Sequence, residues 1–338
     1  MSVELMELKD SARRVVDEAG LAATEDALWS KIIELGWLLV SVPEYLAGLE
    51  AGSRGAGVMH AELGRGLSSA PYLPAMLAVD AICQSRINDQ DNLLESLLGG
   101  NFISAPMAEC WVTTDGNIIS GVVHGVQSAD KASYLLVYTD CEEFILLVAL
   151  NQPGVEITAR PTWDQTRRLY DVRLLSLNIN NQVILQEGAG AADSIQRVLS
   201  QRDFALAADS IGGANAMLEL TIEHLQTRFQ FNRPLAMFQS LKHRCADLKA
   251  SISGAEAMLL DALGNIDEVL DSSDARLKAM GAKLLATTVY REVAEDCLQL
   301  HGGIGIAKEH PCHLFLKRAM LSEQLSGSNS IYASTLAQ

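Results

Sequence analysis

The spacing of apolar residues changes twice along the chain, and these changes limit the folds that it can adopt. In the first hundred residues, apolar side chains recur at helical intervals, for example through Leu28–Leu39. Between Phe102 and Ile184 the segments are short, rich in Val, Ile, Tyr and Thr, and separated by turn residues. Helical spacing returns near Asp193 and continues to the end. We therefore predict an α+β protein, mainly α, in which a β-domain lies between two helical parts.

The changes in spacing also suggest domain boundaries. We predict an N-terminal helical domain at 1–101, a middle β-domain at 102–190 and a C-terminal four-helix bundle at 191–338. The predicted strands are Asn117–Val126, Tyr134–Tyr138, Phe144–Leu150, Gly154–Ala159 and Gln182–Gln186. The predicted bundle helices are 194–228, 234–263, 274–300 and 313–325.

Charge and cysteine content argue against several classes of partner and compartment. A net charge of −16 disfavours binding to nucleic acid or to an anionic membrane surface. The six cysteines are scattered without a CxxC pair, and the first ten residues do not resemble a signal peptide, so we expect reduced thiols in the cytoplasm. The longest apolar run, Phe144–Leu150, is too short to span a bilayer.

Polar side chains and glycines concentrate in two stretches, Arg228–Leu248 and Gln299–Gly305. An arginine such as Arg228 suits a pyrophosphate, because its guanidinium is planar and always charged, and bare glycine backbone lets a ligand approach closely. We interpret both stretches as holding one end of a dinucleotide. The alternatives are an ordinary arginine at a helix end and a glycine C-cap. A Rossmann fingerprint is excluded, because these glycines follow a predicted helix instead of a strand.

Other chemistry finds little support in the sequence. His301, His310, Cys312 and His313 lie near one another, but their spacing fits no standard zinc pattern, so we expect no metal site. No G-x-S-x-G elbow is present, which argues against a serine triad.

Four motifs, in this order, resemble those of the acyl-CoA dehydrogenase family, and the resemblance covers nearly the whole chain. The motifs are Gly36-Trp37 with Val42-Pro43-Glu44, Glu62–Arg65 before Pro71, Arg228–Leu235 with Phe238–Asp247, and Gln299–Gly305 before Glu309-His310-Pro311. The resemblance implies the fold with a helical domain, a β-domain and a four-helix bundle. It also implies FAD as cofactor and an acyl-CoA thioester as substrate, with a carboxylate that removes the α-proton while the β-hydride moves to the flavin.

In this family each FAD lies across a subunit boundary, and the neighbouring subunit holds its pyrophosphate and adenosine end. The resemblance assigns this role to six residues of the present chain. They are Arg228, Phe231, Gln239, Gln299, Gly302 and Gly303.

The chain departs from the family pattern mainly where the flavin ring and the base would lie. Ser326 occupies the usual position of the catalytic Glu, and the other known position of the base holds Arg202, with Asp203 beside it. A serine hydroxyl cannot act as the base at neutral pH without an activating partner. The flavin-contacting W-I-T segment is replaced by Val126-Gln127-Ser128, and the T-E-P loop is not recognisable around Ala108-Glu109-Cys110. Asn232 stands where the corner motif normally has Gly.

Three hypotheses follow. In the first, the chain is the non-catalytic partner in a heteromeric, FAD-dependent acyl-CoA dehydrogenase, a heterotetramer with two copies of each subunit, and the acyl-CoA binds at the partner's site. Such chains resemble the short, base-less subunits of enzymes that act on steroid side-chain CoA esters. In the second, the chain is a self-sufficient homo-oligomeric dehydrogenase that uses Asp203 or Glu323 as the base. In the third, it is a scaffold of the same fold that binds neither flavin nor thioester.

Overall fold

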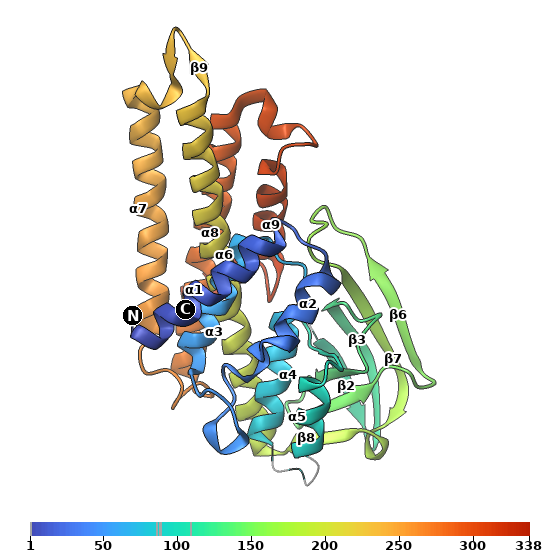
Figure 1. The fold of residues 1–338 in the computed structure, drawn as a ribbon. Helices are drawn as coiled ribbons and strands as arrows, with labels where there is room; N and C mark the ends of the chain where they lie inside the picture. Colours follow the sequence, from blue (N-terminus) through green and yellow to red (C-terminus); the bar gives the residue numbers. More distant parts are fainter. Residues whose placement is uncertain (1, 86, 88–89, 109) are drawn as a thin grey trace.

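The computed structural model describes residues 2–85, 87, 90–108 and 110–338, and its helices and strands follow one another in three blocks (Figure 1). The first block contains α1 (Val3–Ala19), α2 (Glu25–Glu34), α3 (Gly52–Arg65), α4 (Tyr72–Gln84) and α5 (Gln90–Leu98). The last block contains α6 (Ala189–Thr227), α7 (Gln239–Ala262), α8 (Ser273–His301), α9 (Cys312–Gln324) and α10 (Asn329–Leu336). The predicted fold class is confirmed. No helix within the described residues is long and apolar enough to cross a membrane.

The middle block forms two four-stranded sheets with the orders β1-β4-β5-β8 and β2-β3-β7-β6. The strands are β1 (Ile103–Ser104), β2 (Cys110–Asp115), β3 (Ile118–Gln127), β4 (Tyr134–Tyr138), β5 (Phe144–Ala149), β6 (Val155–Arg160), β7 (Leu169–Asn178) and β8 (Val183–Glu187). Strand β1 pairs with β4 in parallel, and the other pairs are antiparallel. The prediction missed the two-residue strand β1 in the first sheet, and β2 and β7, which flank β3 in the second sheet.

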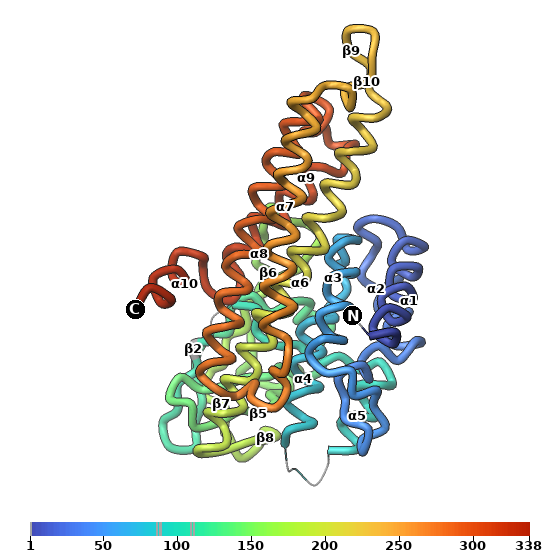
Figure 2. Tube along the Cα trace, turned by 90° about the vertical axis from the view of Figure 1, so that its left-hand side faces the viewer, coloured from blue at the N-terminus to red at the C-terminus, as the bar shows by residue number. Residues whose placement is uncertain are grey.

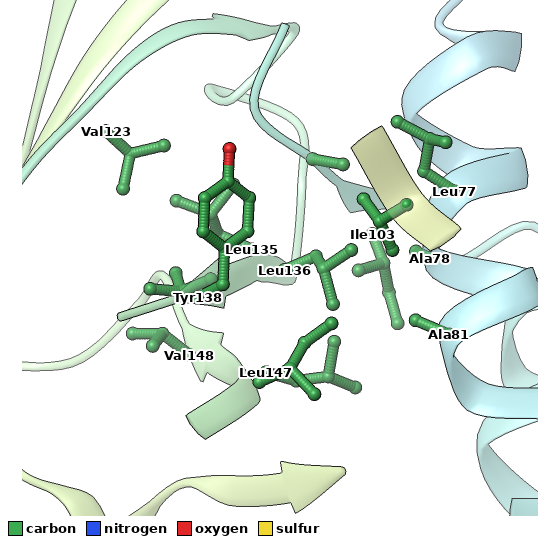
Figure 3. Packing of buried hydrophobic residues seen from close by; sticks show 14 of the residues in the cluster. Leu77, Ala78, Ala81, Ile103, Val123, Leu135, Leu136, Tyr138, Leu147 and Val148 are labelled. Atoms are coloured by element: carbon green, nitrogen blue, oxygen red, sulfur yellow. The ribbon is translucent and has the colours of Figure 1, made fainter. Parts of the chain in front are cut away.

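One apolar core joins the first sheet to the N-terminal helices. Leu136 of β4 and Leu147 of β5 are fully buried, and they share a core cluster with Ala78 and Ala81 of α4 (Figure 3). Both strands are apolar along their whole length because helices or the second sheet cover both of their faces. The core therefore fixes the sheet against α4.

Helices α3 and α6 approach each other at backbone contact. A Cβ atom at Gly212 of α6 would lie 1.8 Å from the carbonyl oxygen of Ala61, and one at Gly64 of α3 would lie 2.1 Å from that of Asp209. Only glycine leaves room for this contact. The pair joins the N-terminal helices to the bundle.

We expect Gly212→Ala to destabilise the chain by about 3 kcal/mol, because the added methyl group must push two backbones apart. The free energy of unfolding in urea measures the change. The matched control is Gly254→Ala in α7, where no atom lies within 4 Å of the new Cβ. That variant should gain up to about 1 kcal/mol from helix propensity. Equal effects at the two sites would contradict the packing argument.

A buried ionic cluster joins all three blocks. Arg318 of α9 is fully buried and donates to Asp164, at 3.0 Å, from the loop between β6 and β7. It also donates to Asp209 of α6 and, at 2.7 Å, to the carbonyl of Ser68 after α3. A buried charge is tolerated only with such partners, so these contacts hold the blocks in one arrangement.

His60 of α3 is buried close to this cluster, and its burial lowers its pKa to about 4. The unfolded chain, with an imidazole pKa near 6.5, therefore binds more protons than the folded chain between pH 6.5 and 4. The stability that neutral His60 provides is complete above pH 6.5, and up to about 3 kcal/mol of it is lost as the pH falls to 4. Measured by urea unfolding, the free energy of unfolding should decrease less as the pH falls from 6.5 to 4 in His60→Leu than in the parent chain. His243→Leu, at an exposed position on α7, should leave this pH dependence unchanged.

Candidate functional site

A short hairpin projects beyond one end of the helical bundle (Figure 2). It consists of β9 (Phe229–Gln230) and β10 (Arg233–Pro234), which pair in antiparallel register between α6 and α7. The two turn residues, Phe231 and Asn232, have φ angles of 52° and 61°. Both positions thus lie in the left-handed region that a two-residue hairpin of this kind requires, and Asn tolerates that region better than most residues. This explains how Asn232 can replace Gly in the corner motif.

The hairpin changes one sequence prediction. Helix α7 begins at Gln239 and not at Pro234, because the segment between them is extended at Pro234 and then forms a 3-10 turn. Gln239 is consequently the first residue of the helix and is exposed.

An open groove of about 480 Å³ lies between the hairpin and the end of α8. Five of the six residues predicted to hold the cofactor line it, namely Arg228, Phe231, Gln299, Gly302 and Gly303. Gln239 is not among the residues that line the groove. Segments about seventy residues apart in the sequence thus form one surface.

The guanidinium of Arg228 is available to a ligand. The residue is exposed at the C-terminal end of α6, and its side chain makes no hydrogen bond or ion pair with any residue that the structure describes. By contrast, Arg233 lies over the ring of Phe238, with 3.9 Å between the guanidinium carbon and the ring centroid. Burial, together with His310 and Arg228, lowers the pKa of His224, which also lines the groove. Arg228 therefore provides the positive charge of this surface.

Gly302 and Gly303 divide the two roles considered for the glycine stretch. It ends α8 with φ 64° and ψ −146°, a backbone conformation essentially restricted to glycine. A Cβ atom added at Gly302 or Gly303 would have no neighbouring atom within 4 Å, so packing within this chain does not exclude a side chain at either position. Gly302 caps the helix, while Gly303 leaves open backbone at the groove.

Large apolar side chains around the hairpin and the following loop are exposed, and we refer to them together as the apolar tip. The apolar tip consists of Phe229, Phe231, Met237, Ile304 and Ile306, which are between 52% and 84% exposed. A monomeric protein rarely leaves such a group in water, and a patch of this kind marks an interaction surface. The apolar tip borders the groove, so a partner that covers it would also complete the groove.

The position of the usual catalytic base lies at the other end of the bundle and is closed. Ser326 is buried and accepts a hydrogen bond of 2.8 Å from Nε of Arg202. The Nη1 group of Arg202 donates to the carbonyl oxygens of Pro106 and Ala108, at 3.1 and 2.9 Å. The arginine thus ties α6 to the β-domain and to the loop after α9. Among the described residues, no free carboxylate occupies this position.

Asp203 is fully buried and already has three donors. Its carboxylate accepts hydrogen bonds from the Ser326 hydroxyl, from Tyr332 of α10 at 2.8 Å, and from the guanidinium of Arg276 in α8. Three donors fill most of the lone-pair sites of this carboxylate, and its complete burial keeps it from a substrate proton. Asp203 therefore belongs to the buried packing between α6, α8 and α10.

Glu323, the other candidate base, is also paired. Its carboxylate lies 3.1 Å from the guanidinium of Arg291, and its side chain is 12% exposed. Helix α9 ends at Gln324, so Glu323 and Ser326 do not lie one helical turn apart. The ammonium of Lys283 donates to the carbonyls of Glu323 and Gly327 and holds this segment in place, and burial lowers the pKa of Lys283 to about 8.

The segment that replaces the flavin-contacting W-I-T motif packs against the N-terminal helices. The hydroxyl of Ser128 donates to Glu25 at 2.8 Å, and the amide of Gln127 donates to the carbonyl of Ser69 at 3.0 Å. Both side chains are buried. Glu109, in the loop that lacks the T-E-P motif, lies outside the described residues.

Sequence reasoning missed Arg276, Lys283 and Tyr332. Together with Arg202 and Asp203 they form the buried polar group around Ser326, which we refer to as the closed cleft. A signal was available, because Lys283 follows Ala279 and Met280 on one face of a helix and precedes Ala286 and Thr287, all of them buried. A basic residue on a buried helical face requires partners from elsewhere in the chain.

Comparisons with known proteins show what the chain is similar to. The sequence model for the acyl-CoA dehydrogenase C-terminal domain matches residues 188–338. The acyl-CoA dehydrogenase IpdE2 of Mycobacterium tuberculosis is 33% identical over 304 residues, which cover 89% of this chain and 82% of that protein.

Two solved structures share the whole fold. A variant of the Tcur3481-Tcur3483 steroid ACAD is 25% identical with a TM-score of 0.87, over 99% of this chain and 96% of that one. The ChsE4-ChsE5 complex from Mycobacterium tuberculosis contains a chain that is 22% identical with a TM-score of 0.88, over 100% of this chain and 97% of that one.

Proposed function

This chain belongs to the acyl-CoA dehydrogenase family, and from that premise we propose that it is the non-catalytic subunit of a heteromeric enzyme. The cofactor of the family is FAD, which accepts the hydride of the substrate when it is bound. This chain would hold the pyrophosphate and adenosine end of FAD through Arg228, Phe231, Gln299, Gly302 and Gly303. A homologous subunit would supply the flavin-ring site and the base.

The contrast between Arg228 and Ser326 carries this proposal. An exposed guanidinium, without an ion-pair partner among the residues that the structure describes, borders a groove of about 480 Å³, which fits a diphosphate. Where the base is expected, a serine hydroxyl is instead enclosed by Arg202, Asp203 and Tyr332. The surface proposed to hold the diphosphate is thus open, whereas the position expected for the base is filled by the chain's own side chains.

The apolar tip supports an obligate partner. Its side chains lie beside the groove, which Phe231 lines, so a subunit that binds there buries them and faces Arg228 at the same time. The ChsE4-ChsE5 structure is described as a complex of two proteins, and the Tcur3481-Tcur3483 protein is described as a steroid ACAD. By this likeness we propose a heterotetramer and a steroid-derived acyl-CoA thioester, bound at the partner's site.

The contacts of this chain favour neither of the two alternatives, a self-sufficient enzyme or a scaffold. A self-sufficient enzyme would need Asp203 or Glu323 as its base, and both carboxylates are paired. A scaffold without cofactor would leave the free Arg228 without a role.

The deciding experiment compares the chain purified alone with the chain co-expressed with a full-length homologue that carries the base. We expect little bound FAD and no acyl-CoA dehydrogenation for the chain alone, and both for the complex, measured by flavin absorbance and by reduction of an artificial electron acceptor. Full flavin content and turnover in the lone chain would overturn the proposal.

A substitution at Glu323 tests whether this carboxylate is the base. Glu323→Gln in the complex should leave turnover per bound FAD within about twofold, because the carboxylate is already engaged by Arg291 at 3.1 Å and by Asn329 at 3.5 Å. A loss of several orders of magnitude would assign the base to this chain instead.

A further inference from the structure

Three side chains with metal-binding atoms meet where the chain passes from α8 to α9. His301 is the last residue of α8, Cys312 is the first residue of α9, and His310 lies in the loop between them. One nitrogen of each histidine and the sulfur of Cys312 all lie within 4.8 Å of one another. The sequence spacing matched no zinc pattern, because the loop and the 3-10 turn at Gly302–Ile306 create the convergence only in three dimensions.

The imidazole of His301 is oriented as a metal ligand would be. The residue is 5% exposed, and its Nδ1 lies 2.8 Å from the carbonyl oxygen of Cys297, to which it donates. Its Nε2 therefore carries the lone pair, and this buried atom has no hydrogen-bond partner among the described residues. An unpaired buried acceptor is costly, and a histidine that binds a metal commonly donates its other ring nitrogen to a backbone carbonyl.

The other two groups approach from the side of α9. The ring of His310 lies 4.8 Å from that of His301, at an interplanar angle of 59°, so the two rings are not stacked. Cys312 is fully buried. The neighbouring ring of His224 is stacked on His301, with 4.5 Å between the ring centroids and 28° between the ring planes, and it is not part of this group.

We propose that His301, His310 and Cys312 bind one zinc ion. Two imidazoles and a thiolate are a donor set that zinc favours, with bonds of about 2.0–2.3 Å in a tetrahedron. These bonds bring the donor atoms to about 3.5 Å from one another, so the side chains must close by about 1 Å from their present separation. The thiol of Cys312 loses its proton to solvent as the zinc–sulfur bond forms, and water takes the fourth position.

The ion would fasten the end of α8 to the start of α9. His301 also borders the groove, next to Gly302 and Gly303. Bound zinc would therefore fix the glycine segment of that groove. The metal site itself does not depend on the proposed cofactor or partner.

Metal titration of the full-length chain tests this inference. After removal of metal with a chelator, the chain is titrated with Zn²⁺ and, as a spectroscopic probe, with Co²⁺. We expect one Zn²⁺ per chain, a sulfur-to-cobalt charge-transfer band in the near ultraviolet, and a higher midpoint of thermal unfolding with Zn²⁺.

Variants assign the ligands. Cys312→Ser should remove the charge-transfer band and weaken Zn²⁺ binding about 100-fold or more, and His310→Gln should weaken binding while retaining a sulfur band. Cys141→Ser, which changes the exposed thiol on the β-domain, is the matched control and should behave as the parent chain. Unfolding without metal shows whether each variant is folded. Substoichiometric binding, or unchanged binding after Cys312→Ser in a folded chain, would overturn the proposal and leave a water molecule as the partner of the His301 nitrogen.

Discussion

Replacing Arg228 by alanine is expected to remove most of the FAD from the assembled enzyme. A guanidinium that forms two charge-assisted hydrogen bonds with a diphosphate contributes about 3 kcal/mol, so FAD should bind about 100-fold more weakly. Within the described part of the chain, no other arginine or lysine lines the groove, and Arg233, which does not line it, stacks on Phe238. The ratio of flavin to protein after gel filtration, and titration of the flavin-free complex with FAD, measure the change.

The matched control is Arg244→Ala, which removes an arginine of α7 that pairs with Asp296 at 2.7 Å and does not line the groove. It should retain FAD. Arg228→Lys should bind FAD with intermediate affinity, because an ammonium group provides the positive charge but cannot form the bidentate hydrogen bonds of a guanidinium. Unchanged flavin content in Arg228→Ala would support the scaffold hypothesis, because the chain would then have no part in holding the cofactor.

Sequence reasoning predicted the fold well where burial produces one simple pattern. Strand β4 was predicted with its observed bounds, Tyr134–Tyr138, because it is apolar along its length and ends at turn residues. Strand β7 was missed because one of its faces is open, so that Asp171 and Arg173 interrupt the apolar residues Val172 and Leu174. Charged residues on the open face of a sheet are common, but along a single sequence they resemble a loop.

The two halves of the candidate site differ in how far the sequence could predict them. The groove residues come from two short motifs, so the resemblance identified five of its lining residues directly. The closed cleft depends on Arg276 and Tyr332, which lie more than fifty residues from each other and from Asp203. No local sequence pattern predicts such a contact, because the burial of a charge depends on the packing of several helices at once.

Removing the carboxylate of Asp203 should destabilise the folded chain strongly without removing the base of the reaction. Asp203→Ala would leave Arg276, whose side chain is 15% exposed, without its buried counter-charge, and it would remove the acceptor for Tyr332 and Ser326. Breaking a buried pair in this way costs about 3–5 kcal/mol. The expected result is a marked fall in the midpoint of thermal unfolding and in the yield of complex.

Turnover must be counted per bound FAD in the fraction that remains folded, because only that measure separates a structural role from a catalytic one. We expect this value to stay within about threefold of the parent complex, whereas loss of the catalytic base lowers turnover by a factor of about 100 to 10,000. Asp203→Asn keeps one acceptor oxygen, for either Ser326 or Tyr332, while removing the charge opposite Arg276, so it should be less destabilised than the alanine variant. The matched control is Asp296→Ala, whose half-exposed pair with Arg244 should contribute no more than about 1 kcal/mol. If Asp203→Asn instead forms a stable complex that retains FAD but does not turn over, Asp203 is the proton acceptor. The base would then belong to this chain, and the assignment of the chemistry to a partner subunit would be wrong.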